Sequence, residues 1–265
     1  MRELSPRIDI TEFFGQVARA PARVLMLDYD GTLAPFQVRP ERAVPYPGVE
    51  ELLDGIMAAE RTRVVIVSGR PVEDLVPLLN LRRRPELWGA HGWERLLPDG
   101  RGSRVQPDDA ARKRLDEGER RARELARAGA RVETKPASVA FHWRGASALT
   151  AARIQEALPR LWEPLAAGGD LELLPFDGGV ELRARGCNKQ HAAKAVLSET
   201  AGDGAIAYLG DDLTDEDAFR VVKLRGLTVL VRPELRETVA DLWIRPPREL
   251  IAFLDRWREA CGGAS

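Results

Sequence analysis

The chain has 265 residues, of which 44% are hydrophobic and 31% charged, so it has enough apolar material for a substantial core. Its 40 basic and 41 acidic side chains leave a formal net charge of -1, which excludes a global attraction to nucleic acid or to an anionic membrane. Two cysteines without CxxC spacing argue against a zinc site or a disulfide framework, and the lack of a signal-peptide pattern or a membrane-length apolar stretch predicts a cytoplasmic protein.

The first predicted strand, residues 24–27, leads directly into two carboxylates. Short uninterrupted apolar runs are typical of strands buried on both faces of a parallel sheet. Asp28 and Asp30 follow this run two residues apart, and Gly31 permits a sharp turn after them. Hydrolysis of a phosphate monoester needs a nucleophile and an acid that protonates the leaving alkoxide, and two such carboxylates can fill these roles. The alternative is an Asx-type turn that simply closes the strand.

The second predicted strand, residues 64–67, ends at Ser68, Gly69 and Arg70. Helices are predicted on either side of it, at 48–59 and 71–80. A hydroxyl and backbone N–H groups at the start of a helix suit a phosphoryl oxygen. Serine is also a common helix N-cap, so this segment alone does not distinguish a phosphate site from a cap.

The middle of the chain has a different pattern. A long charged helix over 107–128 precedes two alternating stretches at 131–135 and 138–144, and a second helix over 147–166 precedes strands at 170–174 and 180–183. The order α-β-β-α-β-β predicts a small helix-covered sheet inserted into the larger fold. The arginine-rich first helix could be a nucleic-acid-binding stripe, but its interleaved acidic residues favour a solvated face.

Two further motifs follow the insert. Lys189 stands at the start of a helix predicted over 190–201, where its ammonium could neutralise a carboxylate nucleophile and a transferring phosphoryl group; an exposed lysine is the alternative. The strand at 205–209 leads into Asp211, Asp212 and Asp215. Clustered carboxylates repel one another unless a cation binds, and oxygen ligands favour Mg²⁺. A helix N-cap with an acidic first turn would explain part of this cluster.

Outside the insert, strands alternate with helices, and the series ends with a helix at 214–223, a strand at 227–231 and a helix at 247–260. This alternation predicts an α/β fold, a Rossmann-like doubly wound parallel sheet. Ligands of such sheets bind beyond the carboxyl ends of the strands, so Asp28, Ser68 and Asp211 are expected at one edge. We place this core at residues 1–103 and 185–265, and an inserted α+β domain (αββαββ) at 104–184.

The motifs DYDGTL, SGR, a lysine and GDDLTD, in this order, resemble those of the haloacid-dehalogenase-like phosphatase superfamily over nearly the whole chain, and the insert resembles its large cap domain. More narrowly, the chain is similar to the trehalose-6-phosphate phosphatase family in residues 89–94, 133–135, 142–144 and 180–183. Two positions depart from that family's pattern: Gln190 replaces the usual glycine after the lysine, and Trp143 stands where tyrosine is common.

The resemblance implies roles for the matching residues. Asp28 would attack phosphorus and become an aspartyl phosphate, while Asp30 would protonate the leaving sugar oxygen and then activate water. Lys189 and a magnesium ion would supply positive charge at phosphorus, and Ser68 together with Lys189 would stabilise the phosphoryl oxygens. The Mg²⁺ ligands would be Asp28, the Asp30 carbonyl and Asp211, with Asp212 and Asp215 in support. The remaining substrate contacts would come from Gly69, Arg70, His91, Glu133, Lys135, Arg144 and Glu181.

The substrate implied by the resemblance is trehalose 6-phosphate, and a trehalose-phosphate synthase would belong to the same pathway. Two alternatives stay open at this point. Another glycosyl phosphate, such as glucosylglycerol phosphate or a pseudosaccharide phosphate, would require the same catalytic residues and differ only in the cap. A sugar-phosphate sensor without activity is the other alternative, although the intact acidic residues and Lys189 argue against it.

Overall fold

The computed structural model describes residues 1–126, 130–176, 178–186 and 188–262. These residues form two compact units, one of Met1–Arg104 with Asn188–Ser265 and the other of Val105–Cys187. Cys187 itself lies outside the described residues, and Cys261 is buried. None of the described helices has the length and apolarity that crossing a membrane requires.

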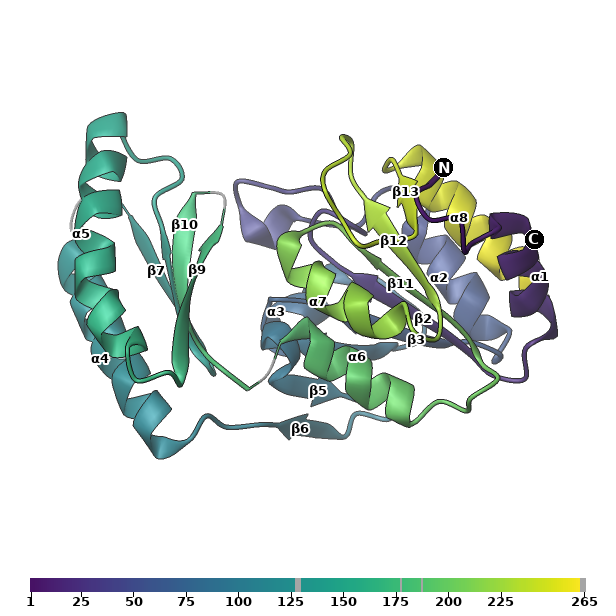
Figure 1. Ribbon diagram of the computed structural model, residues 1–265, viewed down its shortest axis with the longest axis horizontal. Coiled ribbons are helices and arrows are strands. Elements are labelled where there is room, and N and C mark those ends of the chain that lie inside the picture. Colours follow the sequence, from purple (N-terminus) through teal and green to yellow (C-terminus); the bar gives the residue numbers. More distant parts are fainter. Residues whose placement is uncertain (127–129, 177, 187, 263–265) are drawn as a thin grey trace. The chain divides into compact units, whose positions relative to one another are not determined.

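The larger unit contains a nine-stranded sheet whose six central strands run parallel (Figure 1). From one edge to the other, its strands are β1 (Arg2–Glu3), β13 (Leu242–Ile244), β12 (Leu227–Val231), β11 (Ala205–Gly210), β2 (Arg23–Asp28), β3 (Arg63–Val67), β4 (Glu86–Gly89), β5 (Glu94–Leu96) and β6 (Gly102–Arg104). Strand β2 lies between β11 and β3, so the loops after these three strands meet at one edge of the sheet.

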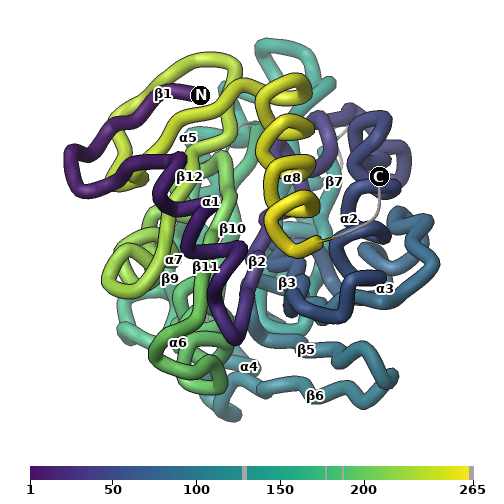
Figure 2. Tube along the Cα trace, turned by 90° about the vertical axis from the view of Figure 1, so that its right-hand side faces the viewer, coloured from purple at the N-terminus to yellow at the C-terminus, as the bar shows by residue number. Residues whose placement is uncertain are grey.

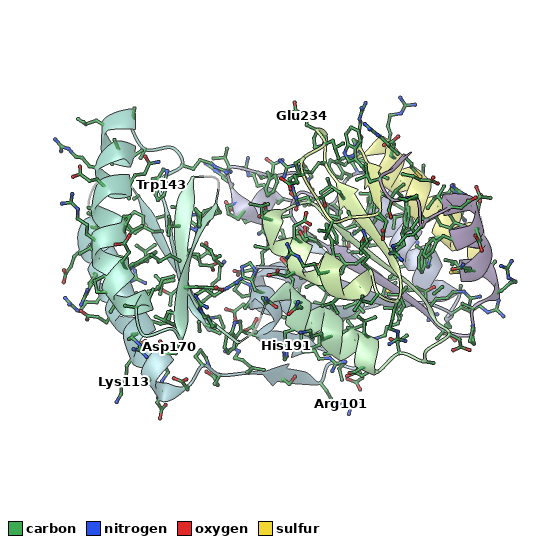
Figure 3. The ribbon with its side chains drawn as sticks, in the orientation of Figure 1. Arg101, Lys113, Trp143, Asp170, His191 and Glu234 are labelled. Atoms are coloured by element: carbon green, nitrogen blue, oxygen red, sulfur yellow. The ribbon has the colours of Figure 1, made fainter. Side chains whose placement is uncertain are left out.

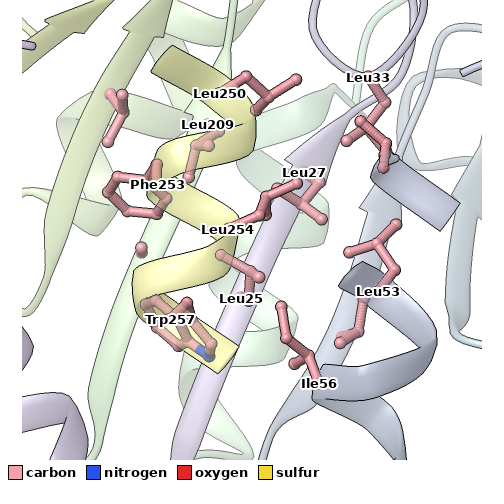
Figure 4. Packing of buried hydrophobic residues seen from close by; sticks show 14 of the residues in the cluster. Leu25, Leu27, Leu33, Leu53, Ile56, Leu209, Leu250, Phe253, Leu254 and Trp257 are labelled. Atoms are coloured by element: carbon pink, nitrogen blue, oxygen red, sulfur yellow. The ribbon is translucent and has the colours of Figure 1, made fainter. Parts of the chain in front are cut away.

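Helices cover both faces of this sheet because alternate side chains of its strands point to opposite faces (Figure 2). Leu25 and Leu27 of β2 belong to a buried cluster with Phe253 and Trp257 (Figure 4), whereas Met26 belongs to the cluster on the other face. The first face carries α1 (Ile10–Arg19), α2 (Val49–Ala58) and α8 (Arg248–Ala260), and the second carries α6 (Lys189–Ser198) and α7 (Leu213–Val222). The predicted doubly wound α/β core is confirmed.

Some elements differ from the prediction. The helix predicted over 71–80 is a single turn, α3 (Val72–Leu75), that continues as the 3-10 turn η2 (Val76–Leu78), because Pro77 has no N–H to extend the helix. The unpredicted α1 begins after Asp9, whose side chain accepts hydrogen bonds from two backbone N–H groups. Strands β1, β4, β5, β6 and β13 were also not predicted, because two to four residues are too few to show a periodicity. Two short turns complete this unit, η1 (Pro40–Arg42) and η3 (Ala90–Gly92).

The smaller unit is an antiparallel sheet with two helices, in the predicted order α-β-β-α-β-β. Its strands are, across the sheet, β7 (Arg131–Lys135), β8 (Ser138–His142), β10 (Gly179–Ala184) and β9 (Leu171–Phe176), and its helices are α4 (Asp109–Leu125) and α5 (Ala148–Ala166). Phe141 meets Trp162 of α5 edge to face at 6.5 Å, and the Trp162 indole donates to the Gly118 carbonyl of α4. A Cβ on Gly118 would lie 2.6 Å from Leu182, so glycine permits α4 to approach the sheet.

Candidate active site

A buried lysine joins two carboxylates at the carboxyl edge of the large sheet. Lys189 Nζ donates to Asp28 Oδ1 at 2.7 Å and to Asp215 Oδ1 at 2.8 Å. Asp28 is the last residue of β2, and Lys189 is the first residue of α6, whose N-cap Asn188 accepts from the backbone N–H of His191. Burial disfavours the charged lysine, but Asp215 and Asp28 outweigh it and hold the pKa of Lys189 above its usual value. The lysine is therefore a charged part of the site and not an exposed surface residue.

Asp215 is fixed by its other partners. Its Oδ1 also accepts from the Tyr208 hydroxyl at 2.8 Å, and its Oδ2 accepts from the backbone N–H of Asp212 at 3.0 Å. Asp212 is the N-cap of α7, so the capping alternative considered for this acidic cluster holds for Asp212 and Asp215. The same contacts hold the Asp215 carboxylate in place as a counterion for Lys189.

Asp28, Asp211 and Asp215 form a cluster that can hold a metal ion. One carboxylate oxygen from each lies within 4.8 Å of the others, and all three side chains are buried. Among the described residues, Asp28 Oδ2 has no hydrogen-bond partner. Burial raises the pKa of Asp28 to about 7 despite Lys189, and burial with repulsion from Asp28 raises the pKa of Asp211 well above its usual value. When all three carboxylates are ionised, their charge exceeds that of Lys189 by two, and a divalent cation with oxygen ligands would neutralise this excess.

The turn after β2 allows Asp28 and Asp211 to come together. Gly31 has φ +84°, in the left-handed region, and its N–H donates to the carbonyl of Ala34 at 2.7 Å. A Cβ at this position would lie only 2.2 Å from Asp211 Oδ2. Glycine is thus required both for the backbone conformation and for the approach of the two strand ends.

Asp30 is not a member of the carboxylate cluster, and its side chain forms an ion pair with Arg70. Nε and Nη2 of Arg70 donate to Oδ2 and Oδ1 of Asp30, each at 2.6 Å. Ser68 is buried and follows β3, and its Oγ accepts from the backbone N–H of Arg70 at 3.1 Å. The DYDGTL and SGR segments are therefore joined through side chains, as well as through the pairing of β2 with β3.

His91 lies against the SGR segment. The backbone N–H groups of Ala90 and His91 donate to the carbonyls of Arg70 and Ser68, at 2.7 and 3.0 Å. A Cβ on Gly69 would lie 2.6 Å from Cε1 of His91, so the imidazole packs directly on the glycine backbone. Both Ala90 and His91 have positive φ, 48° and 58°, which is uncommon for residues with side chains and is typical of functional sites.

The smaller unit gathers three of the predicted sugar-binding residues on one face of its sheet. Glu133 and Glu181 are both paired with Ala140 across the strands, so they flank it on the face opposite the helices. Lys135 Nζ donates to Glu181 Oε1 at 3.2 Å, and Ser138 Oγ donates to the same oxygen at 2.6 Å. These charged groups stand next to one another and can donate and accept hydrogen bonds.

His142 lies beside Glu133 on the same face. Its Nε2 is 2.8 Å from Glu133 Oε2, and its ring packs against Phe176. Burial tends to raise the pKa of Glu133, but His142, Lys135 and Arg131 together lower it to about 2. The carboxylate is thus held ionised, in the form that accepts hydrogen bonds.

Arg144 is placed differently from the prediction. Strand β8 ends at His142, and the exposed Arg144 lies in the turn beyond it. Arg144 packs beside Gly178: a Cβ added to this glycine would lie 2.9 Å from the Cβ of Arg144. Trp143 precedes it (Figure 3) and donates its backbone N–H to the Gly178 carbonyl. The strand was predicted to reach residue 144, but it ends two residues earlier, at His142, because the chain turns there.

Sequence reasoning did not single out His142, Ser138 or Tyr208 as site residues. Each contacts a predicted residue that is distant in the chain, by 9, 43 and 7 positions respectively, so no local spacing revealed them. Gln190 is the second residue of α6, and its amide donates to the Asp217 carbonyl at 3.4 Å. A helical backbone at this position does not need the glycine that is usual in the resembling family.

Residues 26–238 match the model of the family described as trehalose-phosphatase. The bifunctional trehalose-6-phosphate synthase/phosphatase of Thermoproteus tenax is 33% identical over 259 residues, which cover 97% of this chain and 34% of that protein. The trehalose-phosphate phosphatase of Mycobacterium tuberculosis is 33% identical over 260 residues, which cover 91% of this chain and 62% of that protein. The chain thus spans about a third and about three fifths of the lengths of these two relatives.

Solved structures show the same fold. The C-terminal domain of trehalose-6-phosphate phosphatase from Candida albicans superposes with a TM-score of 0.79 at 20% identity and covers 100% of both chains. The trehalose-6-phosphate phosphatase of Aspergillus fumigatus has a TM-score of 0.68 at 25% identity, with 96% of this chain and 98% of that chain covered. A phosphatase of the haloalkanoate superfamily from Bacteroides thetaiotaomicron shares the fold with a TM-score of 0.57 at 16% identity.

Proposed function

Because the chain belongs to the trehalose-phosphatase family, we propose that it hydrolyses trehalose 6-phosphate to trehalose and phosphate with Mg²⁺ as its cofactor. The observation that carries this proposal is the buried group of Asp28, Asp211, Asp215 and Lys189. It combines a carboxylate that has one oxygen without a partner among the described residues, a fixed ammonium and an excess of negative charge suited to a divalent cation.

In the first half of the reaction, Asp28 attacks phosphorus and the bond to the sugar oxygen breaks. Asp30 gives its proton to the leaving oxygen, and an aspartyl phosphate forms. Lys189 orients Asp28 through Oδ1 and, with Ser68, stabilises the charge on the phosphoryl oxygens. Asp28, the Asp30 carbonyl and Asp211 would hold Mg²⁺, with Asp212 and Asp215 in support, and the ion would supply the positive charge on which phosphoryl transfer mainly depends.

In the second half, Asp30 accepts a proton from water, which attacks the aspartyl phosphate and regenerates Asp28. The sugar is recognised by the cap, the domain of residues 104–184, through Glu133, Lys135, Arg144 and Glu181. Ionised carboxylates accept hydrogen bonds from vicinal hydroxyls, and lysine or arginine donates to ring oxygens. Gly69 and His91 contribute further substrate contacts beside the phosphate.

A trehalose-phosphate synthase would supply the substrate, and we place both reactions in the cytoplasm. The Thermoproteus tenax relative carries both activities in its name, which supports a direct succession of the two.

A phosphate-release screen tests the proposal. Trehalose 6-phosphate, glucosylglycerol phosphate and other sugar phosphates are compared with Mg²⁺ and with a chelator, which should abolish release. A preference for the trehalose ester of less than tenfold, about 1.4 kcal/mol, would contradict the substrate assignment. Absence of release from every sugar ester would refute phosphatase activity and favour the sensor.

The variant Asp28→Asn tests the nucleophile. Because the amide cannot attack phosphorus, turnover should fall by about 10³-fold or more while substrate binding is largely retained. Asp203→Asn, which changes an exposed aspartate in the same way, is the matched control and should keep full activity. The measurements are phosphate release and ligand binding by calorimetry.

A further inference from the structure

We propose that Arg70 is a positioning residue for Asp30, and that it does not serve as a ligand of the substrate phosphate. The inference rests on the proposed phosphatase function, in which Asp30 protonates the leaving sugar oxygen. It revises the role that the family resemblance implies for Arg70.

The guanidinium of Arg70 holds Asp30 from two directions. Nε donates to Oδ2 and Nη2 donates to Oδ1, both at 2.6 Å, which is the bidentate arrangement that fixes a carboxylate in plane as well as in position. An aspartate at the edge of a turn could otherwise occupy several staggered rotamers. The two bonds fix the carboxylate that is left once Asp30 has given up its proton. While Asp30 carries the proton, one oxygen keeps its bond to Arg70 and the O–H of the other oxygen donates to the leaving sugar oxygen.

Arg70 is itself anchored on the other side. Its Nη1 donates to the Pro40 carbonyl at 2.9 Å, its backbone N–H donates to Ser68 Oγ at 3.1 Å, and its Cζ lies 5.8 Å from the centre of the Tyr29 ring. Each side-chain nitrogen therefore bonds to Asp30 or Pro40. One side chain joins the DYDGTL turn, the SGR turn and the loop at Pro40.

This arrangement predicts a dependence on the leaving group. A sugar alkoxide is a poor leaving group and needs a proton from Asp30, whereas a nitrophenolate leaves without one. If Arg70 acts through Asp30, its loss slows cleavage of the sugar ester and barely affects the nitrophenyl ester. If Arg70 instead bound the phosphate, which the two esters share, its loss would slow both to the same extent.

The experiment measures kcat/KM for trehalose 6-phosphate and for p-nitrophenyl phosphate, since this ratio covers the steps up to the aspartyl phosphate and leaves out its hydrolysis. Arg70→Ala should lower kcat/KM at least about tenfold for the sugar ester and less than about threefold for the nitrophenyl ester. Arg70→Lys, which keeps the charge but cannot form the bidentate arrangement, should show the same pattern with a smaller loss. Arg42→Ala removes an exposed arginine from the same loop and should change neither value.

A double-variant cycle completes the test. With Asp30→Asn already in place, Arg70→Ala should lower kcat/KM for the sugar ester by no more than about threefold further, because a residue that acts through Asp30 has nothing left to position. Equal losses on the two esters, or losses that multiply in the double variant, would overturn the proposal while leaving the phosphatase function intact. If Arg70→Ala fails to fold, the same comparisons are decided with Arg70→Lys. An unaltered chain that cleaves no sugar ester would refute both proposals.

Discussion

At the scale of single residues, the positive charge of Lys189 holds negatively charged carboxylates together in the protein interior. Its ammonium touches Asp28 and Asp215, and Asp211 lies within the same carboxylate cluster. An isolated ammonium would be expensive to bury, but this one is retained because it is paired on two sides. Removing it would leave three buried carboxylates facing one another.

Lys189→Met should therefore impair both stability and activity. Breaking a buried pair by removing one partner costs about 3–5 kcal/mol, and loss of the ammonium at phosphorus should lower kcat by about 10²-fold or more. Lys194→Met is the control, since Lys194 lies exposed on the same helix. Urea unfolding and phosphate release measure the two effects. A Lys189 variant as stable as the control, with more than a tenth of its activity, would contradict this account of the site.

At the scale of elements, the turn that follows β2 is shaped by contact with the strand beside it. Gly31 has the positive φ of a left-handed residue, and the space where a side chain would begin is occupied by the Asp211 carboxylate. Gly169 has the same φ, +84°, but no atom lies within 4 Å of its potential Cβ. Substitution of either glycine would strain the backbone, but only a side chain at Gly31 would also collide with Asp211. Comparing the two positions therefore separates the effect of backbone strain from that of steric crowding at the site.

Gly31→Ala and Gly169→Ala should differ in function more than in backbone strain. Both place an L-residue in the left-handed region, at about 1–2 kcal/mol of stability. Gly31→Ala should additionally displace Asp211 and lower phosphate release by at least about tenfold, because a misplaced group at the reacting centre costs rate steeply. If the two variants retained equal activity, the contact between the turn and Asp211 would be irrelevant to function.

At the scale of the whole molecule, a nearly neutral chain contains a strongly negative buried site. The net charge of -1 gives no general attraction for cations, so the binding of a metal would depend on the local cluster. Binding of an ion that only the folded state holds also stabilises that state, by about 2.7 kcal/mol when the free ion exceeds its dissociation constant a hundredfold.

Mg²⁺ should therefore raise the thermal unfolding midpoint by about 5–10 °C near saturation, and a chelator should reverse the rise. In Asp211→Asn most of the rise should disappear, because one carboxylate of the cluster is replaced by a neutral amide. The exposed Asp203→Asn variant should respond like the unaltered chain. Differential scanning calorimetry measures the shift, and an equal rise in the Asp211 variant would place the ion elsewhere.

The sequence by itself determined the elements whose cause is local. The apolar runs at 24–27, 64–67, 205–209 and 227–231 are strands in the structure, and polar residues follow three of them at one sheet edge because parallel strands end together. The order of helices and strands in the insert was also predictable, because it follows from the local periodicity of the sequence. The strands of two to four residues escaped, since so few residues carry little pattern and tertiary contacts decide them. The break at Pro77 has a local cause, the missing N–H, that the periodicity alone did not reveal.

Only the tertiary structure decided which of the predicted residues touch. Lys189 meets Asp28 across 161 positions, Arg70 meets Asp30 across 40, and His142 meets Glu133 across 9. Such pairs depend on strand order, on register and on the room that Gly31 leaves for Asp211, none of which is encoded in a local spacing. Periodicity determines where strands and helices lie, whereas the packing of distant segments determines how the charges are paired.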